Sequence, residues 1–302
     1  MNDCSSIVPL CSGWVIYGDS VRNIVIVRNI ISGETAFEIP LNAKPNRMAY
    51  DRNSGRLFVT MISSTNLAKV DLVNKTVTYM PMGGVYDYIA IDNDQTVFLS
   101  SYYGNAAPHT IQVMDGRTGN LLSSIGSYYD GGEISYDPAG SSVFVGVTGI
   151  SPATLYRFTY SAPILNPTPV QNSRNLGSNA QDLTLSPDGT RLLFSTGSGN
   201  GSSGYSIFDV NSYDLTISNG SYDTGAYPTS AAFSPDGMQV IATNRYDVKL
   251  YDANNHALIK TMPRAISGNF RFVRFSQAGR IVYALYRDTY GAGSYSIHWW
   301  KN

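Results

Sequence analysis

Ser186-Pro187-Asp188-Gly189 and Ser234-Pro235-Asp236-Gly237 are two copies of the same tight turn, and they decide the fold. A short apolar run precedes each copy, at 183–185 and 231–233. A second run rich in β-forming residues follows each copy, at 191–194 and 239–243. This arrangement predicts a strand, a turn and another strand at both places.

Weaker copies of the turn begin at Asp51, Asp92, Asp137 and Ser276. The six turns therefore start at positions 51, 92, 137, 186, 234 and 276, in steps of 41, 45, 49, 48 and 42 residues. A repeat of about 45 residues with strands at both ends is typical of β-propeller blades.

A second signature lies in the same units, where a strand ends on an apolar residue and an aspartate: Asp71, Asp115, Asp209 and Asp252. We expect these aspartates to accept hydrogen bonds from backbone at the strand ends. A turn and a fourth strand follow each of them. Four antiparallel strands per unit predict an all-β fold, a seven-bladed β-propeller formed by residues 1–302 as a single domain.

The expected blades span residues 3–42, 45–83, 84–130, 131–177, 178–225, 226–268 and 269–302. The last unit ends before its fourth strand. Residues 3–8 are candidates for that strand, which would protect an open sheet edge. They are equally candidates for the inner strand of the first blade, so the sequence leaves open how the ring closes.

The segment from Pro228 to Asn244, PTSAAFSPDGMQVIATN, resembles the YVTN-type β-propeller repeat of bacterial and archaeal surface-layer and periplasmic proteins. Its Ala242-Thr243-Asn244 stands where that family has its name-giving tetrapeptide, and 248–252 matches the family's third strand. The likeness is good over residues 180–260 and loose elsewhere. It implies an extracytoplasmic and usually non-catalytic propeller, and it carries over no catalytic residue.

Charge and hydropathy exclude some partners. The formal net charge is −1 and charged residues make up 14% of the chain, so the basic excess typical of nucleic-acid binders is missing. No apolar stretch approaches 18 residues, so we expect no membrane insertion. The chain has 22 Tyr and 28 Gly but few Lys, which favours an extracytoplasmic location, with a signal peptide removed or the domain cut from a larger chain.

The two cysteines, Cys4 and Cys11, lie seven residues apart around an expected turn. They are placed either to cross-link a hairpin or to remain free thiols, and the sequence does not decide between these. Two cysteines are too few for a cysteine-based metal cluster.

Alignment of the units places one residue of each inner strand at an equivalent position near the mouth of the central channel: Arg47, Tyr88, Glu133, Asp182, Ser230 and Phe272. One residue earlier are Asn46, Asp87, Gly132, Gln181, Thr229 and Arg271. Two interpretations follow. These residues form a polar ligand pocket, with Arg47, Asp87, Tyr88, Glu133, Asp182 and Arg271 as binding residues, or their charges pair with one another.

Tyr102, Tyr103, Tyr128 and Tyr129 fall in expected loops beside Gly, Asn and Ser. Exposed tyrosines among small polar residues provide contact area at low entropic cost, and their rings also stack on sugars. We therefore expect these loops to bind a partner.

The sequence as a whole predicts an extracytoplasmic, non-catalytic binding module for a protein or glycan at the cell surface, with no cofactor. The alternative is a metal-dependent, lactonase-like hydrolase with Ca²⁺ in the channel, held by Asp87, Glu133 and Asp182.

Overall fold

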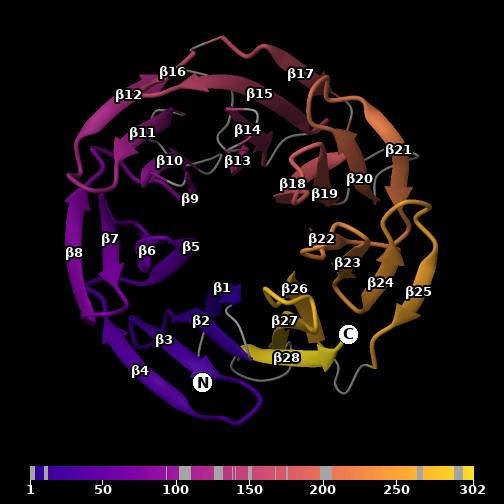
Figure 1. Ribbon diagram of the computed structural model, residues 1–302, viewed down its shortest axis with the longest axis horizontal. Helices are drawn as coiled ribbons and strands as arrows, with labels where there is room; N and C mark the ends of the chain where they lie inside the picture. Colours follow the sequence, from indigo (N-terminus) through magenta and orange to yellow (C-terminus); the bar gives the residue numbers. More distant parts are fainter. Residues whose placement is uncertain are drawn as a thin grey trace.

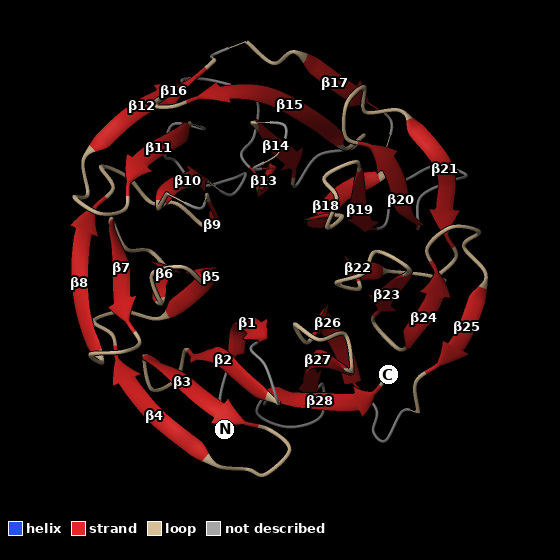
Figure 2. Ribbon diagram, in the orientation of Figure 1, coloured by secondary structure: helices blue, strands red, loops and turns tan. Residues whose placement is uncertain are grey.

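Seven antiparallel sheets are arranged as a ring in the computed structural model (Figure 1). The structure describes residues 4–9, 13–92, 94–101, 110–125, 132–137, 139, 141–148, 152–166, 168–174, 176–197, 206–263, 268–288 and 295–302. Within these ranges every regular element is a strand (Figure 2). The prediction of an all-β, seven-bladed propeller is confirmed.

The first three sheets each contain four strands, which are stacked in order from the centre of the ring to its rim. The first contains β1 (Cys4–Pro9), β2 (Trp14–Asp19), β3 (Ile24–Asn29) and β4 (Thr35–Pro40). The second contains β5 (Pro45–Asp51), β6 (Arg56–Met61), β7 (Asn66–Asp71) and β8 (Thr76–Pro81). The third contains β9 (Tyr88–Ile91), β10 (Thr96–Ser100), β11 (Ile111–Asp115) and β12 (Leu121–Ile125).

The fourth sheet has a divided outer edge, because both β16 and β17 pair with β15. It contains β13 (Gly132–Asp137), β14 (Ser142–Val147), β15 (Thr154–Ser161), β16 (Ile164–Leu165) and β17 (Gln171–Arg174). The fifth contains β18 (Ser178–Leu185), β19 (Arg191–Gly197), β20 (Ser206–Asn211) and β21 (Ile217–Tyr222).

The sixth sheet contains β22 (Pro228–Phe233), β23 (Gln239–Asn244), β24 (Val248–Asp252) and β25 (Leu258–Thr261). The seventh contains β26 (Gly268–Phe275), β27 (Ile281–Asp288) and β28 (Tyr295–Lys301), and it has three strands within the described residues.

The ring closes by packing between the first and last sheets. β1 pairs with β2 as the inner strand of the first sheet, which answers the question that the sequence left open. Val15 and Tyr17 of the first sheet share one buried cluster with Tyr283 and Leu285 of the last. Apolar burial therefore joins the two ends of the ring.

The two clearest turns have the same hydrogen bonds. In the sixth sheet the Ser234 hydroxyl donates to Asp236 at 2.6 Å and accepts from the Gln239 amide at 2.9 Å. The Gly237 amide donates to the Ser234 carbonyl at 2.9 Å. The fifth sheet repeats all three bonds, one of them between Ser186 and Asp188 at 2.6 Å. Serine, aspartate and glycine thus each have a separate role in the turn.

Gly237 gives the first testable prediction. Its φ is 73°, and an added Cβ would meet only Pro187 Cδ at 3.9 Å, so the cost of a side chain comes from the backbone alone. Gly237→Ala should lower the free energy of unfolding by about 1 kcal/mol. Met238→Ala is the matched control, because Met238 is exposed and its loss should cost under about 0.5 kcal/mol. Equal denaturation midpoints for the two variants would contradict this account of the turn.

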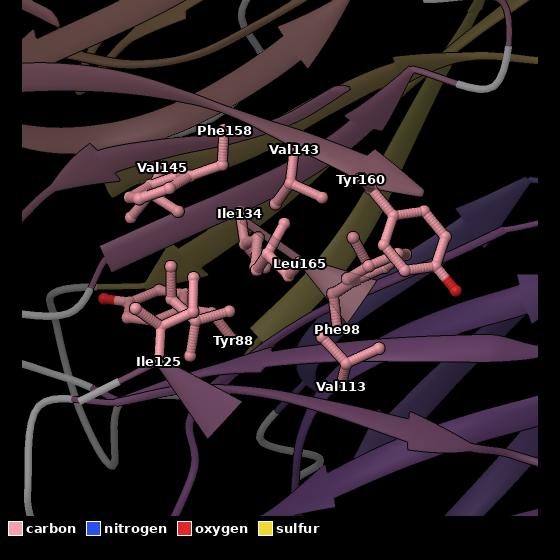
Figure 3. Packing of buried hydrophobic residues seen from close by; sticks show 12 residues of the cluster. Tyr88, Phe98, Val113, Ile125, Ile134, Val143, Val145, Phe158, Tyr160 and Leu165 are labelled. Carbon is pink, nitrogen blue, oxygen red and sulfur yellow. The ribbon is translucent and has the colours of Figure 1, made fainter. Parts of the chain in front are cut away.

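Buried clusters between neighbouring sheets form the core. Figure 3 shows the cluster between the third and fourth sheets, which contains Phe98 and Tyr160. The Phe98 ring meets the Tyr160 ring edge-on, with 4.9 Å between the ring centres, and it also stacks on Tyr136, with 5.1 Å between the ring centres. Val113 and Val143 fill the same cluster from the two sheets. Such packing fixes the inner strands relative to one another, and these strands carry the candidate site.

The aspartates at the strand ends behave as expected in three of four units. Asp71, Asp115 and Asp252 accept backbone N–H bonds from residues two or three positions later. Asp209 does not have this role and pairs with side chains instead. Asn211 takes the capping role there, accepting from the amides of the two residues at 213–214.

The structure tests two other predictions, on membrane insertion and on the disulfide, only in part. The described residues include no helix long and apolar enough to cross a membrane. Cys4 lies on β1, but Cys11 falls outside the described residues, so the question of a disulfide stays open.

Candidate functional site

The aligned positions of the inner strands come together around the axis of the ring. Arg47 on β5 donates from Nη2 to Oε1 of Glu133 on β13 at 2.5 Å. The same guanidinium lies over the Phe272 ring of β26 at 4.4 Å and over the Tyr88 ring of β9 at 5.4 Å. Arg47 therefore links strands of the second, third, fourth and seventh sheets.

A second ion pair lies beside the first. Arg274 on β26 donates from Nη1 and Nη2 to the two oxygens of Asp182, at 2.8 and 3.0 Å. The Ser230 hydroxyl donates to the same carboxylate at 2.5 Å. The Arg274 guanidinium also lies 5.9 Å from the centre of the Phe272 ring, which Arg47 covers too.

We call this group the axial cluster; it consists of Arg47, Tyr88, Glu133, Asp182, Ser230, Phe272 and Arg274. It contains two guanidiniums and two carboxyl groups, and each carboxyl group has an arginine partner. Of the two sequence-based interpretations, the contacts support paired charges.

The arginines are the more exposed members of both pairs. The side chains of Arg47 and Arg274 are 21% and 27% exposed, whereas those of Glu133 and Asp182 are 12% and 4% exposed. The arginines therefore have more solvent contact than the carboxyl groups with which they pair.

Burial has a large effect on Glu133. The pKa of this carboxyl group is raised to about 7, mainly because the group is buried; nearby Asp182 adds to the rise, and Arg47 and Arg274 oppose it. Burial also raises the pKa of the Tyr88 hydroxyl, so that group stays neutral. A carboxyl group that titrates near neutrality is a frequent feature of functional sites.

The pKa of Glu133 predicts how stability depends on pH. The folded chain holds this proton up to about pH 7, whereas the unfolded chain releases it near the ordinary value of 4.5. Between these values the folded state binds more protons, so this group's contribution to stability falls as pH rises. Glu133→Gln removes that dependence. We expect the free energy of unfolding of wild type, measured with urea, to fall relative to that of Glu133→Gln between pH 5 and pH 8. A difference between the two proteins that does not change with pH would contradict the raised pKa of Glu133.

Irregularities in the inner strands aim several of these side chains. The pairing of β5 with β6 shifts between Pro45 and Met48, next to Arg47. Comparable shifts occur beside three other cluster residues: between Ala180 and Asp182, between Pro228 and Ser230, and between Phe270 and Phe272. A β-bulge re-aims a side chain and bends the strand, which explains why these positions converge.

The two remaining predicted ligands lie next to the cluster. The Asp87 carboxylate accepts from Asn46 Nδ2 at 3.2 Å, so these neighbouring units also make contact. Arg271 occupies the irregularity in β26. The arginine that pairs with Asp182 is Arg274, which our alignment missed. Its signal was present, because residues two apart on a strand share a face and Arg274 follows Phe272 by two.

Two of the three proposed calcium ligands have arginine partners. Glu133 and Asp182 each pair with an arginine, and a divalent ion between them would face two guanidiniums. Across the described residues, no group of three or more His, Cys, Asp or Glu is arranged to hold a metal ion.

Tyr102, Tyr103, Tyr128 and Tyr129 lie outside the described residues. Their role in partner binding stays a prediction.

A second buried network joins the fifth and sixth sheets. Arg191 contacts Asp209 through Nε at 3.0 Å and through Nη2, and donates to the Ala253 carbonyl at 2.6 Å. Asp209 is fully buried and also contacts His256 Nε2 at 3.0 Å and the Tyr222 hydroxyl at 3.3 Å. The contacts of this network join strands of both sheets, which indicates a role in holding the two sheets together.

Comparison with known proteins gives the fold. No family model and no curated protein matches the chain, so the resemblance to the YVTN repeat has no independent support. Among solved structures, the chain is similar to one of hydrazine synthase from Kuenenia stuttgartiensis, with a TM-score of 0.73 and 16% identity over 97% of this chain and 94% of that one. At this identity the likeness shows the fold alone, which is a seven-bladed propeller.

Proposed function

We propose that this chain is an extracytoplasmic, non-catalytic propeller that binds a protein or glycan partner. The observation that carries the proposal is the pairing within the axial cluster, where Arg47 and Arg274 hold Glu133 and Asp182. Groups for hydrolysis would need a carboxylate free to act as a base or as a metal ligand. Carboxylates that are already paired with guanidiniums support a rigid binding surface instead.

The proposed location rests on composition and on the repeat. A chain with 22 Tyr, 28 Gly and only 14% charged residues favours a place outside the cytoplasm. The resemblance of residues 180–260 to the YVTN repeat points the same way. Detection of the native protein with an antibody in separated cell fractions tests this part of the proposal, and recovery in the cytoplasmic fraction alone would overturn it.

The binding part of the proposal places the partner contacts on the loop tyrosines. The experiment immobilises the chain and measures binding to an array of defined glycans and to proteins of the extracytoplasmic fraction. The test variant replaces Tyr102, Tyr103, Tyr128 and Tyr129 with alanine together. Tyr213→Ala is the matched control, because Tyr213 is 73% exposed and lies in a different turn.

We expect the fourfold variant to lose affinity for the captured partner by about tenfold or more, since aromatic anchors dominate such interfaces. The control should bind as wild type does. Unchanged affinity in the fourfold variant would remove the loop tyrosines from the proposal. Turnover of lactone or ester substrates by wild type would favour the hydrolase instead.

A further inference from the structure

The last sheet has an open outer edge. In each of the other six sheets, a further strand lies outside the third: β4, β8, β12, β17, β21 and β25. In the last sheet β28 is the third strand, and none of the residues that the structure describes pairs with its outer side.

The backbone of β28 is ready to accept another strand. It pairs with β27 without interruption, from Tyr295 opposite Arg287 to Lys301 opposite Ile281. Asn302 donates its amide to the Arg280 carbonyl at 2.8 Å, and bonds alternate along an antiparallel pair. The amide and carbonyl groups of Ile297, Trp299 and Lys301 therefore point away from β27, toward the open edge.

The shape of the ring favours a single strand at this position. In Figure 1, β28 lies nearer to the centre than β4 and β25, the outer strands of the two neighbouring sheets. Adjacent strands are about 4.8 Å apart, so one strand would bring the last sheet level with its neighbours. A second copy of the propeller fits poorly at this edge. The strands β4 and β25 of each copy lie farther out than β28, so they would meet before the two β28 edges came within pairing distance.

The other outer strands show what side chains this position takes. Most residues of β4 and β8 are exposed or half-buried, but Ile39 and Met80 are buried at 2% and 4% exposure. A second apolar residue, Leu41 or Met82, follows two positions later and is buried too. The expected occupant is therefore a strand that is exposed or half-buried along most of its length and ends in two buried aliphatic residues separated by one residue.

The β28 side chains provide an aromatic surface for this occupant. Trp299 packs partly buried against the cluster shared with the first sheet. Trp300 packs against the cluster shared with the sixth sheet, and its Nε1 donates to the Pro263 carbonyl at 3.3 Å. The tryptophans thus point to opposite faces of the last sheet, and both faces offer apolar contact to an added strand.

We propose that an extended segment of a partner protein adds to β28 as the fourth, antiparallel strand of the last sheet. The segment is about five to seven residues long and ends in the aliphatic pattern described above. Backbone hydrogen bonds to β28 give the affinity, and the two aliphatic side chains give the specificity. This inference rests on the proposed function only in taking the partner to be a protein.

Synthetic peptides that copy the chain's own outer strands are suitable probes. Two peptides span residues 35–41 and 76–82, which both end in the pattern described above. Each has two controls: a scrambled sequence, and the same sequence N-methylated on the alternate amides that would face β28. All changes are made in the peptide, so the folding of the propeller is not affected.

The measurement is amide hydrogen exchange over residues 295–302, with and without peptide at about 1 mM, the weak end of useful affinity. We expect fast exchange at Ile297, Trp299 and Lys301 in the free chain. At least one peptide should slow it by about tenfold or more, and its N-methylated form should not.

Three results would overturn the proposal. The first is slow exchange at these amides in the free monomer, which would show that the chain itself covers the edge. The second is slow exchange only in a dimer seen by sedimentation, which would make a second copy the occupant. The third is fast exchange that no peptide slows. None of these depends on the loop tyrosines, so failure here is distinct from failure of the proposed function.

Discussion

Replacement of Arg274 by methionine should destabilise the propeller by about 3 to 5 kcal/mol. The substitution leaves the Asp182 carboxylate, which is 4% exposed, without its two charge-assisted hydrogen bonds. Breaking a buried ion pair from one side costs this much because the remaining charge stays buried. The free energy of unfolding from urea titration gives the measurement.

The double variant Arg274→Met with Asp182→Asn is the control. Asparagine carries no charge and can still accept the Ser230 hydroxyl, so much of the lost stability should return. A loss below about 1 kcal/mol in the single variant, or no recovery in the double, would show that the axial cluster contributes little to stability.

Replacement of Arg191 by methionine should have a comparable cost, again about 3 to 5 kcal/mol. Asp209 is fully buried and would keep only His256 and the Tyr222 hydroxyl as partners. The Ala253 carbonyl would also lose its bond from Arg191 and keep the longer one from the Tyr222 hydroxyl, at 3.4 Å. A buried carboxylate without its main counter-charge accounts for most of the expected loss.

The variant Arg191→Lys tests whether the positive charge of Arg191 or the planar shape of its guanidinium group provides the stability. Lysine keeps the positive charge but cannot bond Asp209 and the Ala253 carbonyl with one planar group. We expect an intermediate loss of stability, seen as a urea midpoint between those of wild type and Arg191→Met. If lysine were as stable as wild type, simple charge neutralisation would explain the role of Arg191.

The repeat could be recognised from the sequence because each residue of the turn bonds to groups only a few positions away. Ser234, Asp236 and Gly237 satisfy backbone groups within a few positions, so the fold follows from nearby sequence. The spacing then brought equivalent inner-strand residues together, and contacts of Arg47 with Glu133 and Phe272 agree with that alignment.

The remaining features depend on long-range packing. The irregularity at Arg271 has no local pattern that marks it, whereas Arg274 could have been found because it lies two residues after Phe272 on the same strand face. Asp209 was misassigned as a cap because its partners Arg191 and His256 lie 18 and 47 residues away. Asn211, two residues later, accepts the backbone hydrogen bond of the turn in place of Asp209. The alignment of the repeats did not reveal this shift of two residues.

Elemental analysis of the purified chain for bound metal, with a chelator-treated control, tests the central claim most directly. The claim is that the carboxyl groups of Glu133 and Asp182 are committed to Arg47 and Arg274 and are not free for chemistry. It predicts no stoichiometric divalent metal, and the same result for Glu133→Gln. One Ca²⁺ per chain, lost in Glu133→Gln and accompanied by lactone or ester hydrolysis, would contradict the claim and establish the hydrolase.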